Sequence, residues 1–248
     1  MRDSNPSLTV VLPVRSAFRE LQRSLEVLAP LGDAVERIVV DGSDENGERI
    51  STFFAGAPPW NKLLTGAQNG VYAAMNEGVR SARGRYVLFC GAGDLVDVTI
   101  LADWLAEVPT ASTLCAFAVH MGEHREAGVP AVRRPKWGAS LVWQNHIHHQ
   151  GLIAPRSWIL DTPFDERLKV LADYQWILKM WLAGHPMSMH EGILTRAEGG
   201  GLSRQFTAQL YREEWRMKRA VLPWTVMCLQ GIWIPAKWAF KRVASWAR

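Results

Sequence analysis

The chain has 248 residues, of which 48% are hydrophobic and 21% are charged. This composition predicts one folded domain, or one domain with an appendage, and excludes a wholly disordered chain, a collagen-like chain and a multi-span membrane protein. The three cysteines form no close pair, which excludes a disulfide scaffold and a cysteine-rich zinc site. The first residues contain no apolar segment of the kind that directs secretion, so we expect a cytoplasmic location.

Strands and helices alternate along the first half of the chain. β-branched apolar segments predict strands, and apolar residues at helical spacing predict helices. In chain order, we expect a strand at 8–14, a helix at 18–28, strands at 37–40 and 62–65, a helix at 70–82, a strand at 86–90, a helix at 98–107 and a strand at 114–119. This order is typical of an α/β fold with a mostly parallel sheet flanked by helices, a Rossmann-like nucleotide-binding arrangement.

Polar residues that directly follow these strands are the first candidates for a site, because ligands of such sheets bind beyond the carboxyl ends of the strands. They are Arg15, Asp41 and Asp94. Asp41 begins an Asp-Gly-Ser-Asp segment, which predicts either a carboxylate that holds a nucleoside or a simple turn. Asp94 follows glycines that would let a diphosphate and a metal ion approach the backbone; the alternative is an N-cap for the helix that begins near Val98.

The second half of the chain adds histidines, an aspartate and a glycine-rich segment. His146, His148 and His149 have no fourth ligand at a recognisable spacing, so a hydrogen-bonding or phosphate-contacting role is favoured over a zinc site. Asp173 opens an apolar helix, either as an N-cap or as a general base at a pocket wall. Residues 199–203 predict either a moving loop over a site or a simple hinge.

Positive charge gathers at the C-terminus. From residue 204 onward there are nine basic and two acidic side chains, a net charge of +7, and five of the twelve tryptophans. Basic charge interleaved with tryptophan suits an anionic membrane surface; packing of a buried helix is the alternative. Nucleic acid is disfavoured because the remaining 203 residues carry a net charge of −3.

The apolar stretch of this tail is interrupted by Gln230 and Pro235. Its unbroken part is too short to span a bilayer, and Pro235 is expected to kink or end a helix. We therefore expect an amphipathic helix that lies in the plane of the membrane. The side chains expected to face lipid phosphates are Lys237, Lys241, Arg242 and Arg248.

Seven segments in order resemble family 2 glycosyltransferases of the GT-A fold, in particular the bacterial exopolysaccharide branch that includes colanic-acid-type enzymes. The segments are 9–14 (TVVLPV), 38–43 (IVVDGS), 69–78 (NGVYAAMNEG), 82–89 (ARGRYVLF), 91–94 (GAGD), the pattern HQ, R and FDER within 149–167, and 171–174 (LADY). The sequence departs from the family pattern in four places. Gln68 stands where many relatives have an aspartate, and the segment 41–44 (DGSD) is one residue off the commoner double-aspartate form. Gly91 removes the first polar group of the metal motif, which leaves Asp94 as its only carboxylate, and Ala73 replaces an aspartate.

The resemblance implies a metal-dependent enzyme that transfers a sugar from a nucleotide-diphosphate donor to an acceptor hydroxyl with inversion. It implies Asp173 as the catalytic base and Asp94 as the ligand of Mg²⁺ or Mn²⁺. The residues that it implies in donor binding are Pro13, Arg15, Asp41, Asn76, His149 and Arg156. The acceptor would be a saccharide or a lipid-linked saccharide in the synthesis of cell-surface polysaccharide.

The organisation expected from the resemblance and the tail is a GT-A-like domain over residues 1–203, followed by a membrane-associating helical tail over 204–248. The enzyme would then lie at the inner face of the cell membrane as a peripheral protein. Two other classes stay open. A nucleotidyltransferase on a similar fold is disfavoured because the loop at 15–19 lacks glycine. A non-catalytic module that binds sugar nucleotides or membranes is the other.

Overall fold

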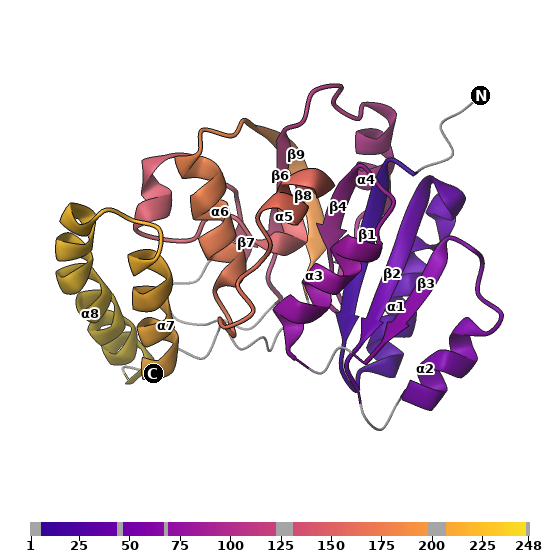
Figure 1. The fold of residues 1–248 in the computed structure, drawn as a ribbon, viewed down its shortest axis with the longest axis horizontal. Coiled ribbons are helices and arrows are strands. Elements are labelled where there is room, and N and C mark those ends of the chain that lie inside the picture. Colours follow the sequence, from indigo (N-terminus) through magenta and orange to yellow (C-terminus); the bar gives the residue numbers. More distant parts are fainter. Residues whose placement is uncertain (1–5, 44–46, 67–68, 123–130, 198–206, 247–248) are drawn as a thin grey trace.

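One sheet organises the molecule (Figure 1). The computed structural model describes residues 6–43, 47–66, 69–122, 131–197 and 207–246, and within them nine strands follow the order β3-β2-β1-β4-β8-β6-β9-β5, with β7 paired to β6. The first half of the sheet is parallel, as the sequence predicts. It consists of β1 (Leu8–Val14), β2 (Val35–Asp41), β3 (Asn61–Thr65) and β4 (Tyr86–Phe89).

The second half of the sheet is mixed, which the alternation of strands and helices does not predict. The strand β8 (Leu152–Pro155) runs antiparallel to β4 and to β6 (Leu114–His120). The strand β9 (Met187–Arg196) runs parallel to β6 and antiparallel to β5 (Leu95–Val96). The short strand β7 (Val132–Arg133) pairs antiparallel with β6, and residues 123–130 lie outside the described part.

Helices cover both faces of the sheet and form two cores. Alternate side chains of β1 point to opposite faces, so that Val10 and Leu12 join one core and Val11 joins the other. The first core includes α1 (Phe18–Leu28) and α4 (Val98–Ala106), and α2 (Gly47–Phe54) lies beside β3. The second core includes α3 (Val71–Ser81), α5 (Arg156–Asp161), α6 (Ala172–Leu182) and Met217 of α7.

Two glycines let the backbone pack closely against β1. A Cβ atom at Gly78 would lie 2.3 Å from Val11 Cγ1, so α3 sits on the sheet at a distance that no larger residue allows. A Cβ atom at Gly84 would lie 2.5 Å from the backbone nitrogen of Thr9. The glycines of the "MNEG" and "ARGRY" segments are therefore packing requirements of the fold.

The C-terminal residues form two helices at the end of the molecule opposite α2 (Figure 1). α7 (Ala208–Arg219) packs against α6 and α8 (Trp224–Trp246). The expectation that Pro235 ends a helix is wrong, because Pro235 lies inside α8 and the helix continues to Trp246.

A buried cluster of charges joins α7 to α8. Glu214 pairs with Lys218 at 2.8 Å, and Lys237 Nζ lies 2.6 Å from both oxygens of the Glu214 carboxylate. Lys218 is fully buried, and burial lowers its pKa to about 8 although Glu214 opposes the shift. The expectation that Lys237 faces lipid phosphates is therefore wrong, because the buried Glu214 carboxylate needs a cation and Lys237 supplies it. The side chains of Lys241, Arg242 and Arg248 lie outside the described part.

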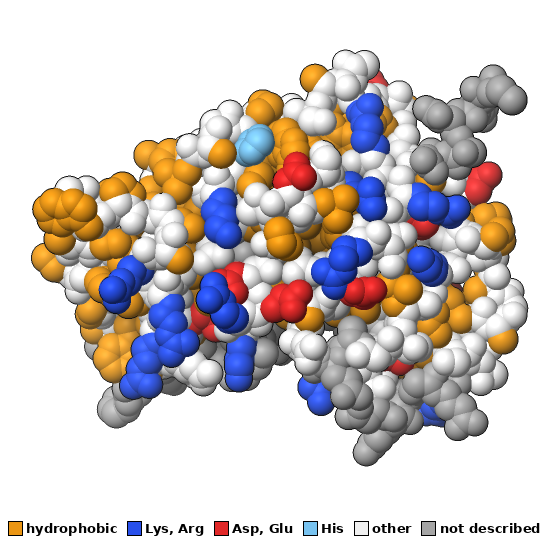
Figure 2. All heavy atoms as spheres, in the orientation of Figure 1, with side chains coloured by type: hydrophobic (Ala, Val, Ile, Leu, Met, Phe, Trp, Pro, Cys, Tyr) orange, Lys and Arg blue, Asp and Glu red, His pale blue; other side chains and the backbone are white. Residues whose placement is uncertain are grey.

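The outer face of α8 is apolar. Trp224 and Ile232 are 77% and 75% exposed, and Leu229 and Trp233 are exposed beside them. Figure 2 shows apolar side chains over this end of the molecule, with lysine and arginine side chains nearby. Lys237 is the sole charged residue between 224 and 239, and it faces Glu214. Among the described residues, no helix is both long and apolar enough to cross a membrane.

We expect Glu214→Gln to lower the free energy of unfolding by roughly 3–5 kcal/mol, because it leaves two neighbouring lysines without their buried counter-charge. Urea unfolding monitored by tryptophan fluorescence measures the change. The matched control is Glu77→Gln, which removes one partner of an exposed ion pair with Arg80 and should cost less than about 1 kcal/mol. Equal stability of the two variants would contradict a buried role for Glu214.

Candidate active site

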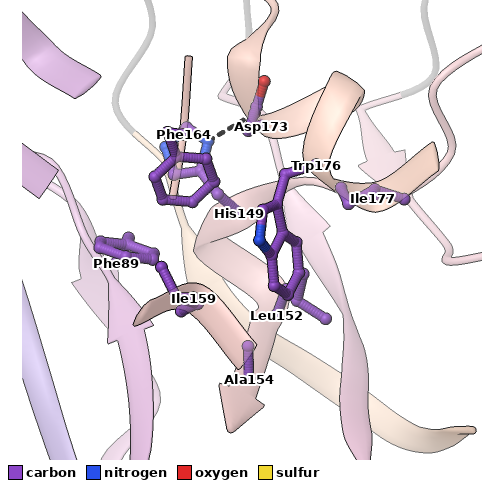
Figure 3. A pocket seen from close by; sticks show the side chains of 9 residues that line it. All are labelled: Phe89, His149, Leu152, Ala154, Ile159, Phe164, Asp173, Trp176 and Ile177. Atoms are coloured by element: carbon purple, nitrogen blue, oxygen red, sulfur yellow. Dashed lines mark hydrogen bonds and ion pairs between the residues drawn. The ribbon is translucent and has the colours of Figure 1, made fainter. Parts of the chain in front are cut away.

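A hydrogen-bonded group of three side chains lies beyond the carboxyl end of β4. Its centre is Asp173 at the start of α6, whose Oδ2 lies 2.9 Å from His149 Nδ1 (Figure 3). Tyr72, at the start of α3, donates its hydroxyl to Asp173 Oδ1 at 3.1 Å and to the Val170 carbonyl at 2.6 Å. The Tyr174 N–H also donates to Asp173 Oδ1, at 2.8 Å. The carboxylate is thus buried but well supplied with donors.

The fold brings these residues together from three distant parts of the sequence. His149 begins the short 3-10 segment that leads into β8. Because β8 runs antiparallel to β4, its first residues lie at the carboxyl end of β4, beside the loop that carries Asp94. Helices α3 and α6 cover the same face of the sheet and direct Tyr72 and Asp173 toward the same point.

Opposing electrostatic effects set the protonation of the pair. Burial favours neutral His149, but the hydrogen bond and charge of Asp173, with the charge of Asp94, raise the pKa of His149 above its ordinary 6.5. Burial would raise the pKa of Asp173, but the hydrogen bond and charge of His149 and the N–H of Tyr174 hold it below its ordinary 3.8. The pair therefore stabilises the fold between these two displaced pKa values. Its contribution is lost as pH falls through the lower pKa or rises through the higher one.

An apolar wall closes one side of the pair. Phe89, Phe164 and Trp176 surround His149 and Asp173 in Figure 3, around a cavity of only about 10 Å³. That volume holds at most a single water molecule, so this side is packed core and a substrate must approach from another side. Burial, with the charge of Asp173, raises the pKa of Tyr72 well above 10, which keeps its hydroxyl protonated as a donor.

Asp94 lies in a tight turn after β4. Its Oδ2 accepts the N–H of Gly91 at 2.6 Å, and the Ser24 hydroxyl accepts the N–H of Gly93 at 2.9 Å and donates to the Asp94 carbonyl at 3.0 Å. The alternative of an N-cap is wrong for Asp94, because Asp97 caps α4 by accepting the N–H groups of two residues in its first turn. Asp94 therefore does not cap α4, and its carboxylate binds the backbone of its own turn.

Comparisons with known proteins decide the family. A family model described as "Glycosyl transferase family 2" matches residues 9–129, which run from β1 through β6 and carry Asp41 and Asp94. Residues 9–129 are therefore a family 2 glycosyltransferase segment.

Relatives and solved structures agree with this family 2 glycosyltransferase assignment. The chain is 26% identical over 268 aligned residues to a protein of Mycobacterium bovis described as "PGL/p-HBAD biosynthesis glycosyltransferase", covering 98% of each chain. An uncharacterised Escherichia coli glycosyltransferase, YibD, is 32% identical over 102 residues, which are 40% of this chain and 30% of YibD. The structure of TarS from S. aureus, titled as a complex with UDP-GlcNAc, has a TM-score of 0.67 and 18% identity over 85% of this chain and 65% of TarS.

Three of the residues expected to bind the nucleotide lie at or near the carboxyl ends of β1 and β2. Asp41 ends β2, and its Oδ1 accepts both the N–H and the hydroxyl of Ser43, so the expected turn is present. Pro13 lies in β1, and Arg15 follows that strand with an exposed side chain. Ser16 has a φ of +56°, a left-handed conformation that ends the strand abruptly.

Asn76 and Arg156 do not join the other expected donor-binding residues. Asn76 Nδ2 donates to the Phe164 carbonyl and to Glu166 Oε1, and its Oδ1 accepts the N–H of Phe164. These hydrogen bonds of Asn76, which lies in α3, fix the segment before α6 against α3. Arg156 follows β8 and lies near the amino end of β4. Its side chain there donates to the carbonyls of Val79 and Arg80 at the end of α3. The antiparallel direction of β8 is the reason for this separation.

Sequence reasoning missed Tyr72 and Ser24. Tyr72 lies within the quoted "NGVYAAMNEG" segment, where the tyrosine was a usable signal, whereas Ser24 lies within α1 and carries no local signal. His146 lies nearer the surface, and burial with the nearby Lys136 and Arg133 lowers its pKa. The expected moving loop at 199–203 lies outside the described residues.

The loop around Asp94 fits a divalent ion that is completed by substrate. A Cβ atom at Gly91 would lie 3.2 Å from Asp94 Oδ2, so the glycine keeps open a space beside the carboxylate. Mg²⁺ and similar ions are held by one or two carboxylates together with phosphate oxygens and water. A single aspartate next to an open space is consistent with that mode of binding.

The titration of His149 tests the ion pair. We expect the pKa of His149 to lie above 6.5 in the native chain and to fall in Asp173→Asn, because the charge of Asp94 alone then opposes the effect of burial. The pH dependence of its imidazole NMR signals measures both values. A His149 pKa that does not change on substitution of Asp173 would contradict the pairing.

Proposed function

We propose that the protein is an inverting glycosyltransferase that moves a sugar from a nucleotide-diphosphate donor to an acceptor hydroxyl, with Asp173 as the base. The observation that carries this proposal is the pairing of the buried Asp173 carboxylate with the partly buried His149, near the end of β4 that Asp94 follows. Two of the similar structures support the donor class, because they are complexes with UDP-GlcNAc and with GDP-Man and Mn²⁺.

In the proposed reaction, the acceptor oxygen attacks the anomeric carbon as the bond from that carbon to the diphosphate oxygen breaks. Asp173 takes the proton that the acceptor hydroxyl loses. His149 and Tyr72 hold the Asp173 carboxylate in one orientation by hydrogen bonds, so the base is pre-positioned. The apolar wall of Phe89, Phe164 and Trp176 keeps bulk water away from one side of the pair.

On the donor side, we assign the nucleoside to Asp41 and to the end of β1 at Pro13 and Arg15. Asp94 would hold the Mg²⁺ or Mn²⁺ ion, which stabilises the charge of the leaving diphosphate when it is bound. The positions of Asn76 and Arg156 favour structural roles for both residues, because their side chains are engaged by backbone carbonyls of the protein itself.

A panel of donors tests the function. Purified protein is incubated with UDP-, GDP- or dTDP-sugars and Mn²⁺ or Mg²⁺, and donor binding and release of the nucleoside diphosphate are recorded. We expect one donor to bind in a metal-dependent way. Asp173→Asn should lower turnover by about 10²-fold or more and spare donor binding, since the base acts on the acceptor. Asp94→Ala should instead weaken metal-dependent binding. Near-normal turnover by Asp173→Asn would refute the assignment of the base.

We further propose that the enzyme docks on the inner face of the cell membrane through α8 and acts on a lipid-linked saccharide in the synthesis of cell-surface polysaccharide. The apolar outer face of α8 over residues 224–239, with exposed Trp224, Ile232 and Trp233, has the amphipathic character of a helix that lies in the interface. The excess of basic residues from 204 onward favours an anionic surface.

Vesicle binding tests the docking surface. We expect the double variant Trp224→Ser with Ile232→Ser to bind vesicles of anionic phospholipid at least about tenfold more weakly, because burial of each side chain contributes about 1.5–3 kcal/mol. The matched control is Leu160→Ser on α5, which removes a 39% exposed apolar side chain elsewhere. Equal cosedimentation of the double variant and the native chain would rule out this face.

A further inference from the structure

Glu213 on α7 holds the backbone that leads to the catalytic base. Its Oε2 accepts the N–H of Lys169 at 3.0 Å, and its Oε1 accepts the N–H groups of Val170 at 2.7 Å and Leu171 at 2.8 Å. The Glu213 side chain is buried, so these hydrogen bonds form away from bulk water. A carboxylate that accepts three backbone N–H groups fixes that backbone firmly.

Residues 169–171 directly precede the first residue of α6. Leu171 is the N-cap of α6, and it offers no side-chain hydrogen bond to the first turn. Asp173 follows two positions later. Glu213 therefore binds, from another helix, the backbone of the N-cap residue of α6 and of the two residues before it.

The same short segment is also bound from the opposite direction. The Val170 carbonyl accepts the Tyr72 hydroxyl, which contacts Asp173 Oδ1 as well. A displacement of residues 169–171 would thus move both the start of α6 and the acceptor that fixes Tyr72. Each of these contributes directly to the position of the Asp173 carboxylate.

We propose that Glu213 is a positioning residue for the base, so that the C-terminal helix α7 is part of the catalytic apparatus. This inference rests on the proposed function of Asp173. Glu213 acts through residues 169–171 and Tyr72, not by contact with substrate, because its carboxylate oxygens are occupied by the three backbone N–H groups. The membrane-docking face lies on α8 and is a separate feature of the same helix pair.

Glu213→Gln tests the proposal in the full-length chain. The amide retains one acceptor but turns a donor toward backbone N–H groups. We expect kcat to fall about 10–100-fold, because small displacements of a catalytic group have effects of this size. We expect the donor KM to stay within about twofold. Glu213→Asp, which keeps the charge on a shorter side chain, should recover part of the loss. The charge-matched control is Glu191→Gln, at an exposed position in β9.

Two further readouts separate positioning from a general loss of stability. Amide hydrogen exchange at residues 169–171 should accelerate in Glu213→Gln while exchange in β1 and β4 stays unchanged. In the Asp173→Asn background, Glu213→Gln should cause little further loss of turnover, because both changes act on one group. Unchanged hydrogen exchange at 169–171 would overturn the proposal. So would a double variant in which Glu213→Gln lowers turnover as much as it does in the native chain.

The exchange measurement requires no activity. If the native chain showed no transfer with any donor, the proposed function would fail, whereas accelerated exchange at 169–171 would still establish the contact of Glu213 with this segment. Accelerated exchange together with an unchanged kcat would overturn the positioning role alone.

Discussion

A carboxylate that is buried as deeply as that of Asp173 keeps its charge only if nearby donors replace the water that it has lost. His149, Tyr72 and the N–H of Tyr174 are those donors, and they come from three separate elements. Their convergence requires α3 and α6 on the same face of the sheet and β8 in its antiparallel direction. The arrangement of the helices on that face can therefore be understood as the framework that allows one aspartate to remain ionised.

The two halves of the sheet differ in how far the sequence predicts them. In the parallel half, apolar segments mark the strands, so the four strands, the helices α1 and α3 and the strand-end residues Asp41 and Asp94 could be placed. The helix α2 was not predicted. In the mixed half, β8 is four residues long and β9 alternates poorly, and nothing local specifies their directions. Arg156 illustrates the result. Because β8 is antiparallel to β4, Arg156 and His149 lie at opposite ends of the strands.

The site itself was predictable where chemistry and local pattern coincide. Asp173 precedes an apolar helix and lies in a segment that resembles the family, so it could be named as a base. Its dependence on Glu213 could not be predicted, since the two residues are 40 positions apart and Glu213 lies in a highly charged helix that has the appearance of a solvent-exposed one. Long-range contacts of a side chain with backbone N–H groups leave no periodic signal in a sequence.

Glu213 and Glu214 are adjacent in α7 but bind different parts of the protein. Glu213 binds the backbone before α6, whereas Glu214 neutralises lysines between α7 and α8, and Met217 of the same helix belongs to the core that includes α3 and α6. These contacts join α7 to the part of the chain that precedes residue 203. A fragment that ended at residue 203 would retain the family 2 segment, yet it would lose the acceptor of three buried N–H groups and one wall of its core. Helix α7 thus supplies side chains on which the core and the segment before α6 depend, although it lies in the basic stretch that begins at residue 204.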